Sequence, residues 1–288
     1  MTTNQVIPPD SVLHFAEQAI HPRRSLWRRL VALIVGSFAA LVVLSILSLV
    51  AQPALQRFLP GDLASLAAAG LSLFVAGTVL ALITCALLRL SPGQLVSVTG
   101  RFRWKLFGLY ALACVPVMAV FLIGSVHGIQ RSDWLLATLV VFAVIPFQVA
   151  GEELAFRGAI QQSVSALLAR WRFRLVAAAL VSAAMFSAAH QPGNIQGLVA
   201  FLTFGLVFAA AGYLTGGLEA PLAIHLINNL YSLGTPTIQV DNTNLLTQNA
   251  TQITWGNAAF SVAINVAALV VIVLISRRLQ ARTTAHPS

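Results

Sequence analysis

The stretch 151–158, Gly-Glu-Glu-Leu-Ala-Phe-Arg-Gly, places two adjacent carboxylates and an arginine in a region that is otherwise almost entirely apolar. Charged side chains are costly in hydrocarbon, so ionisable groups inside an apolar span indicate a functional site by default. Glu152, Glu153 and Arg157 are therefore the first candidates for such a site. Their partners are expected on other apolar segments of the chain.

The composition predicts an all-α integral membrane protein. The chain is 58% hydrophobic and only 9% charged, whereas a soluble domain carries about 25% charged residues. The apolar runs are long and continuous rather than alternating, which favours membrane-spanning helices over a β-barrel. The net charge of +9 does not indicate nucleic-acid binding, because the basic residues cluster at the ends of apolar runs. The lipid bilayer is the expected partner.

The apolar runs predict a polytopic helix bundle with about eight transmembrane helices. They lie at about residues 30–51, 63–88, 106–126, 134–169, 175–190, 196–214, 220–233 and 257–276, the first ending at Gln52-Pro53. Basic residues cluster at every second connection, which predicts cytoplasmic N- and C-termini. The basic residues are almost all arginine, and this usage favours a bacterial plasma membrane.

Helix arithmetic brings the polar groups of three spans to one region. Glu152 and Glu153 precede the basic turn at residues 170–174 by about 19 residues, and His190 follows it by about 18, so both lie about 27–29 Å from the turn. His225 lies about 10–12 Å into the seventh span. These depths agree if the turn extends beyond the membrane surface. A site between helices four, five and seven, in the cytoplasmic half of the membrane, is therefore predicted.

The two glutamates are expected to have different roles. Neighbouring residues of a helix point about 100° apart. Glu153 and Arg157 are spaced i, i+4, which favours an ion pair that keeps Glu153 ionised. Glu152 is then the freer carboxylate and the better candidate base.

Three short motifs occur in order on successive apolar helices: EExxxR at 152–157, FxxxH at 186–190 and HxxxN at 225–229. Together they resemble the three motifs of the CPBP family, the CAAX-protease and bacteriocin-processing intramembrane proteins. Each motif alone is weak, but three in this order are a strong signal. The resemblance implies an intramembrane endopeptidase that acts on a peptide or membrane-associated protein.

The resemblance also implies a role for each motif position. Glu152 would be the general base that activates water, and His190 would help to orient that water. His225 and Asn229 would stabilise the oxyanion of the tetrahedral intermediate. The supporting residues would be Glu153, Arg157 and Phe186.

A metal-dependent mechanism stays open beside the metal-independent one. Relatives are often labelled metalloproteases, and Glu152, His190 and His225 could hold a catalytic zinc with an open fourth position. However, the sequence lacks HExxH, and the two histidines lie on different predicted helices. Metal-independent hydrolysis is therefore the preferred prediction, with no cofactor required.

The expected organisation has four parts. Residues 1–29 form a cytoplasmic tail, 30–133 form three accessory helices, 134–233 form the catalytic core, and 234–288 hold a polar loop, the last transmembrane helix and a basic tail. Two other functions remain possible on the same residues. One is a catalytically silent scaffold or immunity protein of the family, and the other is a proton-coupled transporter that uses intramembrane ionisable groups as a relay.

Overall fold

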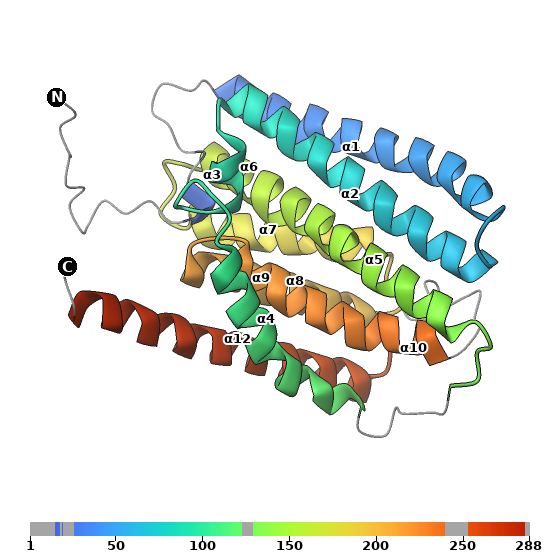
Figure 1. Cartoon of the computed structure of the whole chain (residues 1–288). Helices are drawn as coiled ribbons and strands as arrows, with labels where there is room; N and C mark the ends of the chain where they lie inside the picture. The colour runs from blue at the N-terminus through green and yellow to red at the C-terminus, as the bar shows by residue number, and fades with distance from the viewer. Residues whose placement is uncertain (1–14, 18, 20–25, 123–128, 240–252, 286–288) are drawn as a thin grey trace.

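A computed structural model of the chain describes residues 15–17, 19, 26–122, 129–239 and 253–285. Within these residues the fold is helical, apart from one isolated β-bridge between Ser97 and Gly217. The α-helices are α1 (Leu26–Leu55), α2 (Gly61–Leu88), α3 (Pro92–Val96), α4 (Trp104–Met118), α5 (Trp134–Glu153), α6 (Gln162–Leu167), α7 (Arg174–Ala189), α8 (Ile195–Thr215), α9 (Glu219–Asn229), α10 (Thr235–Gln239) and α12 (Trp255–Ala285) (Figure 1). Two π-helical segments, Leu154–Gln161 and Leu230–Gly234, join α5 to α6 and α9 to α10.

Within the described residues, five helices are long and apolar enough to cross a membrane, as expected of an integral membrane protein. They are Leu26–Leu55, Gly61–Leu88, Trp134–Leu167, Ile195–Thr215 and Trp255–Leu279. Of the other three expected spans, α4 and α7 are shorter apolar helices, and α9 has 11 residues before its π-helical continuation.

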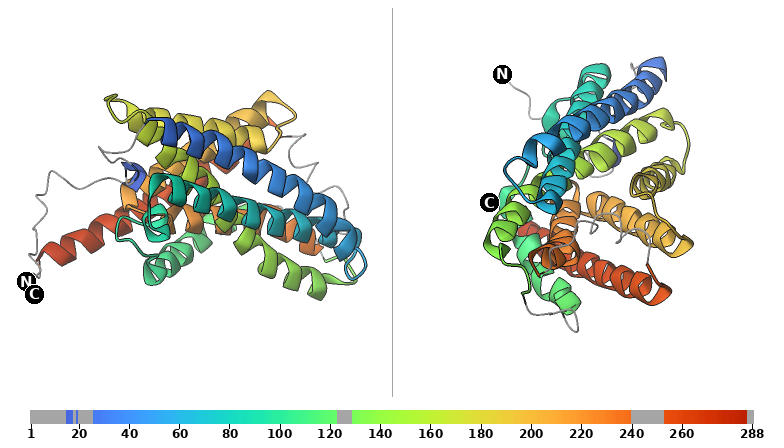
Figure 2. Two further views of the ribbon diagram at one scale, coloured as in Figure 1. Left: turned by 90° about the horizontal axis from the view of Figure 1, so that it is seen from above. Right: turned by 90° about the vertical axis from the view of Figure 1, so that its right-hand side faces the viewer.

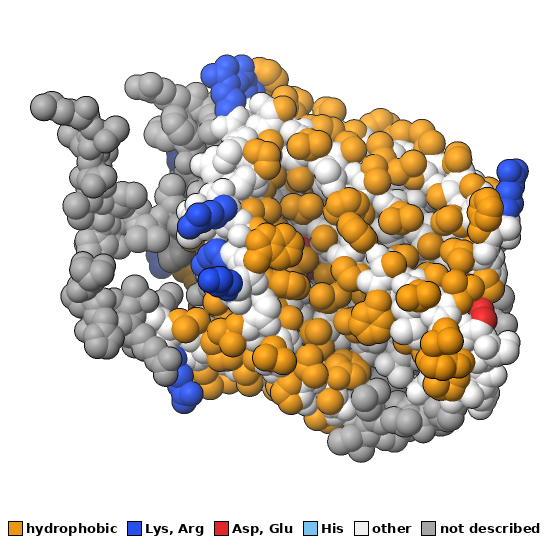
Figure 3. Space-filling view, viewed as in Figure 1, with side chains coloured by type: hydrophobic (Ala, Val, Ile, Leu, Met, Phe, Trp, Pro, Cys, Tyr) orange, Lys and Arg blue, Asp and Glu red, His pale blue; other side chains and the backbone are white. Residues whose placement is uncertain are grey.

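The surface of the molecule divides into an apolar middle and a basic end. Hydrophobic side chains cover the middle of the face in Figure 3, and most of its Lys and Arg side chains gather at the end that carries α3 and α6. Many large apolar side chains on the outer helices are exposed, among them Phe38, Leu49 and Leu139. In lipid such exposure carries no hydrophobic penalty, so the bundle can leave these faces uncovered.

The predicted end of the first span at Gln52-Pro53 is wrong, since α1 continues through Pro53 to Leu55. A proline inside a helix removes one backbone hydrogen bond and clashes with the carbonyl one turn earlier. Here the turn after it is still closed, because the amide of Gln56 donates to the carbonyl of Gln52. The proline therefore lies in the last turn rather than after it.

Two glycines bring α2 and α5 into backbone contact beside the glutamate pair. A Cβ at Gly77 would collide with the backbone of Gly151, and a Cβ at Gly151 would collide with the backbone of Leu73 and Phe74. Small residues at such crossings allow close helix packing in a membrane. Because Gly151 immediately precedes Glu152, this crossing fixes the position of the polar stretch in the bundle.

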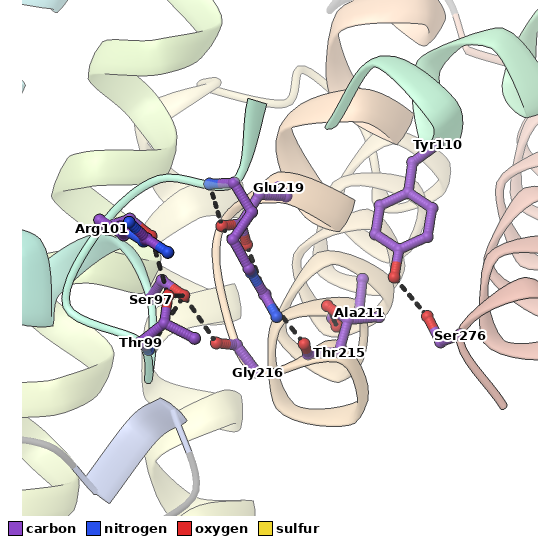
Figure 4. Close-up of polar contacts among 10 residues, drawn as sticks. Ser97, Thr99, Arg101, Tyr110, Ala211, Thr215, Gly216, Glu219 and Ser276 are labelled. Atoms are coloured by element: carbon purple, nitrogen blue, oxygen red, sulfur yellow. Dashed lines mark hydrogen bonds and ion pairs between the residues drawn. The ribbon is translucent and has the colours of Figure 1, made fainter. Parts of the chain in front are cut away.

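A polar clamp ties the α3–α4 connection to the start of α9. Glu219, which is fully buried, accepts hydrogen bonds from the backbone amide of Arg103 at 2.8 Å and from its guanidinium at 2.9 and 2.7 Å. The same guanidinium donates to the carbonyl of Thr215 at 3.0 Å. Gly216 supplies the left-handed turn between α8 and α9, with φ +78°. Figure 4 shows Glu219, Thr215 and Gly216 around this turn.

Candidate functional site

The glutamate pair lies where α5 passes into the first π-helical segment. Glu152 and Glu153 are the last residues of α5, and both are buried. π-Helical insertions leave some carbonyls without regular helical partners and are frequent at functional sites. Here the buried hydroxyl of Ser182 on α7 donates to the carbonyl of Phe156 at 2.7 Å. That bond fastens the π segment to α7.

Glu153 is held by two partners. The Arg157 guanidinium donates to its Oε1 at 3.0 Å, and both side chains are fully buried. Nδ1 of His225, from α9, lies 2.8 Å from the same oxygen. The predicted i, i+4 ion pair is therefore present, and it also anchors the histidine of the third motif.

Aromatic rings surround Arg157 and His225. The guanidinium carbon of Arg157 lies 4.5 Å from the ring centre of Phe186 and 5.1 Å from that of Phe208. Phe208 also stacks on the imidazole of His225, with centroids 4.7 Å apart and planes 20° apart. A buried cation gains from aromatic faces when it is desolvated. Phe208 on α8 thus holds both partners of Glu153 in place.

Glu152 is the freer carboxylate, as predicted. Its Oε1 accepts a hydrogen bond from Gln148 at 3.2 Å, whereas its buried Oε2 has no hydrogen-bond partner. That oxygen lies 3.9 Å from Nε2 of His190 and 3.7 Å from Nε2 of His225. Polar atoms at this separation are suited to bridging by one water molecule.

The partners of the Nδ1 atoms of His190 and His225 indicate which ring nitrogens carry hydrogen. Nδ1 of His190 lies 2.8 Å from the carbonyl oxygen of Phe186, which can only accept, so this Nδ1 carries the hydrogen. Nδ1 of His225 likewise faces the carboxylate that pairs with Arg157. In their neutral forms both histidines therefore present an Nε2 lone pair toward Glu152 Oε2. Three acceptors facing one another require a hydrogen donor between them, and water is such a donor.

The cluster is most open at His190. The side chain of His190 is 27% exposed, compared with 4% for Glu152 and 3% for His225. Its ring stacks on Phe201, with centroids 4.4 Å apart. His190, near the connection between α7 and α8, is therefore the most exposed of these three side chains.

Asn229, predicted as a site residue, lies one turn after His225 on the same face of α9. Its Oδ1 accepts a hydrogen bond from Asn228 at 3.2 Å. Asn228 in turn accepts from Asn265 of α12 at 2.9 Å. The bond to Asn265 joins α9 to α12.

The alternative prediction is a zinc site formed by Glu152, His190 and His225. In the part of the chain that the structure describes, no group of three or more His, Cys, Asp and Glu side chains could hold a metal ion. Glu152 Oε2 lies 3.7–3.9 Å from Nε2 of the two histidines, slightly more than the about 3.4 Å that separates two ligands of one tetrahedral zinc.

Several residues of the cluster lie outside the three sequence motifs. Gln148 is four residues before Glu152, so its helical spacing could have been noticed. Phe208, Phe201 and Asn265 carry no local signal, because apolar rings and single amides are common in membrane helices. Their roles depend on contacts between helices that are distant in sequence.

Comparison with known proteins points to one family. Residues 131–231 match the family described as Type II CAAX prenyl endopeptidase Rce1-like. The uncharacterized protein YyaK of Bacillus subtilis (strain 168) is 30% identical over 108 residues, which cover 35% of this chain and 34% of that protein. The chain thus spans about a third of the length of this relative. No solved structure matches the chain.

Proposed function

We propose that the protein is an intramembrane endopeptidase, because residues 131–231 match the family described as Type II CAAX prenyl endopeptidase Rce1-like. Its substrate would be a peptide or a membrane-associated protein. The observation that carries the proposal is the convergence of Glu152 Oε2 with the Nε2 atoms of His190 and His225. These groups come from all three family motifs.

In the proposed reaction Glu152 is the general base. A water molecule between Glu152 and His190 gives one proton to Glu152 Oε2, and its oxygen bonds to the carbonyl carbon of the scissile peptide. Burial of Glu152 limits competition from bulk water and strengthens interactions inside the site. A general base in such a position contributes about 10²–10⁴-fold to the rate.

The tetrahedral intermediate carries a negative oxygen that needs hydrogen-bond donors. Asn229 can donate through its amide without any change of protonation. His225 can donate from Nε2 only after it takes up a proton there, and Glu152 Oε2 lies 3.7 Å away to supply one. The carbon–nitrogen bond then breaks as the proton that the water gave up passes from His225 Nε2 or Glu152 Oε2 to the leaving nitrogen, which yields a carboxylic acid and an amine.

We extend the proposal to the arrangement in the membrane. The eight helical regions would all contribute to the transmembrane bundle, with the site between the fourth (α5–α6), fifth (α7) and seventh (α9). The end that carries most of the basic side chains in Figure 3 would face the cytoplasm, together with both termini. Residues 134–233 would form the catalytic core in a bacterial plasma membrane, between accessory helices at 30–133 and the C-terminal part at 234–288.

The proposal names no particular substrate, so the experiment compares all the proteins of the membrane fraction. Cells that express either the wild type or Glu152→Gln are analysed for new protein N-termini in the membrane fraction. Cleavage sites are expected with the wild type and with Asp133→Asn, a control carboxylate outside the site, and not with Glu152→Gln. An absence of new N-termini in all three, with folded protein present, would favour the silent scaffold, whereas equal new N-termini in all three would contradict Glu152 as the base.

A further inference from the structure

Asn265 is a buried amide on α12, outside the region that matches the family. It is fully buried and lies about a third of the way along α12. α12 packs against α9 and α8 (Figures 1 and 2). A polar side chain in such a position is costly unless it is hydrogen-bonded. Nδ2 of Asn265 has two hydrogen-bond partners, whereas its buried Oδ1 has none among the described residues. The partners of Asn265 therefore indicate why it is there.

The hydrogen bonds of Asn265 have a fixed direction. Its Nδ2 lies 2.9 Å from the carbonyl oxygen of Ser261, one turn earlier on α12. A backbone carbonyl can only accept, so this end of the amide must be the NH₂ group. The same NH₂ group has a second hydrogen, which it donates to Oδ1 of Asn228 on α9 at 2.9 Å.

The orientation of the Asn228 amide determines which end of the Asn229 amide faces it. Because Oδ1 of Asn228 accepts from Asn265, the NH₂ group of Asn228 is turned the other way. It donates to Oδ1 of Asn229 at 3.2 Å. The oxygen of Asn229 is thus occupied, and the NH₂ group of Asn229 is left to face other groups. A flipped Asn229 amide would present an acceptor where an oxyanion requires a donor.

We infer that Asn265 is a positioning residue that acts through Asn228 to set the orientation of the Asn229 amide. The carbonyl of Ser261 fixes which end of the Asn265 amide is the NH₂ group. Asn265, on α12, in turn fixes the orientation of the Asn228 amide on α9, and Asn228 fixes that of its neighbour Asn229. The accessory helix α12 thereby contributes to a site built by the family domain. The inference rests on the proposed function for its effect on catalysis, but the amide orientation is independent of it.

The first test measures the orientation of the Asn229 amide and does not depend on enzyme activity. Full-length protein labelled with ¹⁵N-asparagine is studied in lipid nanodiscs by NMR, and the side-chain signal of Asn229 is identified by its loss in Asn229→Ala. Asn265→Leu is expected to shift that signal, whereas Asn257→Leu, an exposed residue on the same helix, is not. Asn228→Leu removes the same chain of hydrogen bonds at its α9 end. It replaces Asn265→Leu in this test if Asn265→Leu does not fold. An unchanged Asn229 signal in folded Asn265→Leu or Asn228→Leu would overturn the inference.

The second test measures kcat and KM for a peptide that contains a cleavage site found by the N-terminus comparison. Loss of one oxyanion donor costs about 10²–10³-fold in kcat, so partial misorientation by Asn265→Leu is expected to lower kcat about tenfold with KM unchanged. In the Asn229→Ala background, Asn265→Leu is expected to have no further effect. Equal losses in both backgrounds would contradict action through Asn229. A wild type without any cleavage would refute the proposed function, and the NMR result would still decide the inference.

Discussion

Nδ1 of His225 lies 2.8 Å from Oε1 of Glu153, although 72 residues separate them in the sequence. This contact joins the first and third motifs through a carboxylate that already pairs with Arg157. Glu153 therefore orients the histidine while Glu152, its neighbour, faces the space between the two imidazoles. Adjacent carboxylates thus have different partners, because neighbouring residues of a helix point about 100° apart.

Arg157 should be essential for stability. Arg157→Leu is expected to lower the free energy of unfolding by about 3–5 kcal/mol, because it leaves the buried Glu153 carboxylate without its cation. Thermal unfolding in detergent would measure this, with Arg172→Leu in the exposed turn as the control. The double variant Glu153→Gln/Arg157→Leu should be more stable than Arg157→Leu alone. A double variant that is less stable would refute the ion-pair explanation.

Acid should weaken the connection before α5. Hydrogen bonds from Arg131, whose Nε lies 2.6 Å from Oδ1 of Asp133, hold the pKa of Asp133 below its usual range. The unfolded chain therefore binds this proton more readily than the folded protein, so the contribution to stability is lost as pH falls below about 4. Unfolding temperatures measured between about pH 7 and pH 3 should decline at the acidic end. The decline should be shallower in Asp133→Asn, and an equal decline in both proteins would contradict this assignment.

Removal of divalent metal should leave cleavage unchanged. The described side chains form no three-ligand group for a metal ion, and the proposed water activation uses Glu152 alone as base. Enzyme treated with EDTA and then dialysed should cleave its substrate at the rate of untreated enzyme. Loss of activity that added zinc restores would show that Glu152, His190 and His225 rearrange around a metal.

Gln191, the residue after His190, should tolerate glycine. It has a left-handed backbone with φ +46°, a conformation that costs most side chains about 1–2 kcal/mol. Gln191→Gly is expected to keep or raise the unfolding temperature with cleavage retained, whereas Gln191→Val should lower it because a β-branched residue fits this conformation poorly. If valine were tolerated as well as glycine, the turn after α7 would not require this backbone.

Local spacing in the sequence predicts much of the fold and the first half of the site. Long apolar runs predict membrane helices because hydrocarbon excludes unpaired backbone groups. The order of the three motifs predicts the family. The i, i+4 spacing predicts the Glu153–Arg157 pair, since the period of a helix alone brings those side chains together. The exact helix ends were less predictable, as the extension of α1 through Pro53 shows.

Tertiary structure alone decided how the helices complete the site. The contact of His225 with Glu153, the stacking of Phe208 on His225 and the bond from Asn265 to Asn228 each join separate helices. No periodicity in the sequence specifies such pairs, because helix rotation and crossing depend on packing over the whole bundle. The close approach at Gly77 and Gly151 is one such determinant. The sequence therefore determined which polar groups enter the apolar bundle, and packing determined which of them meet.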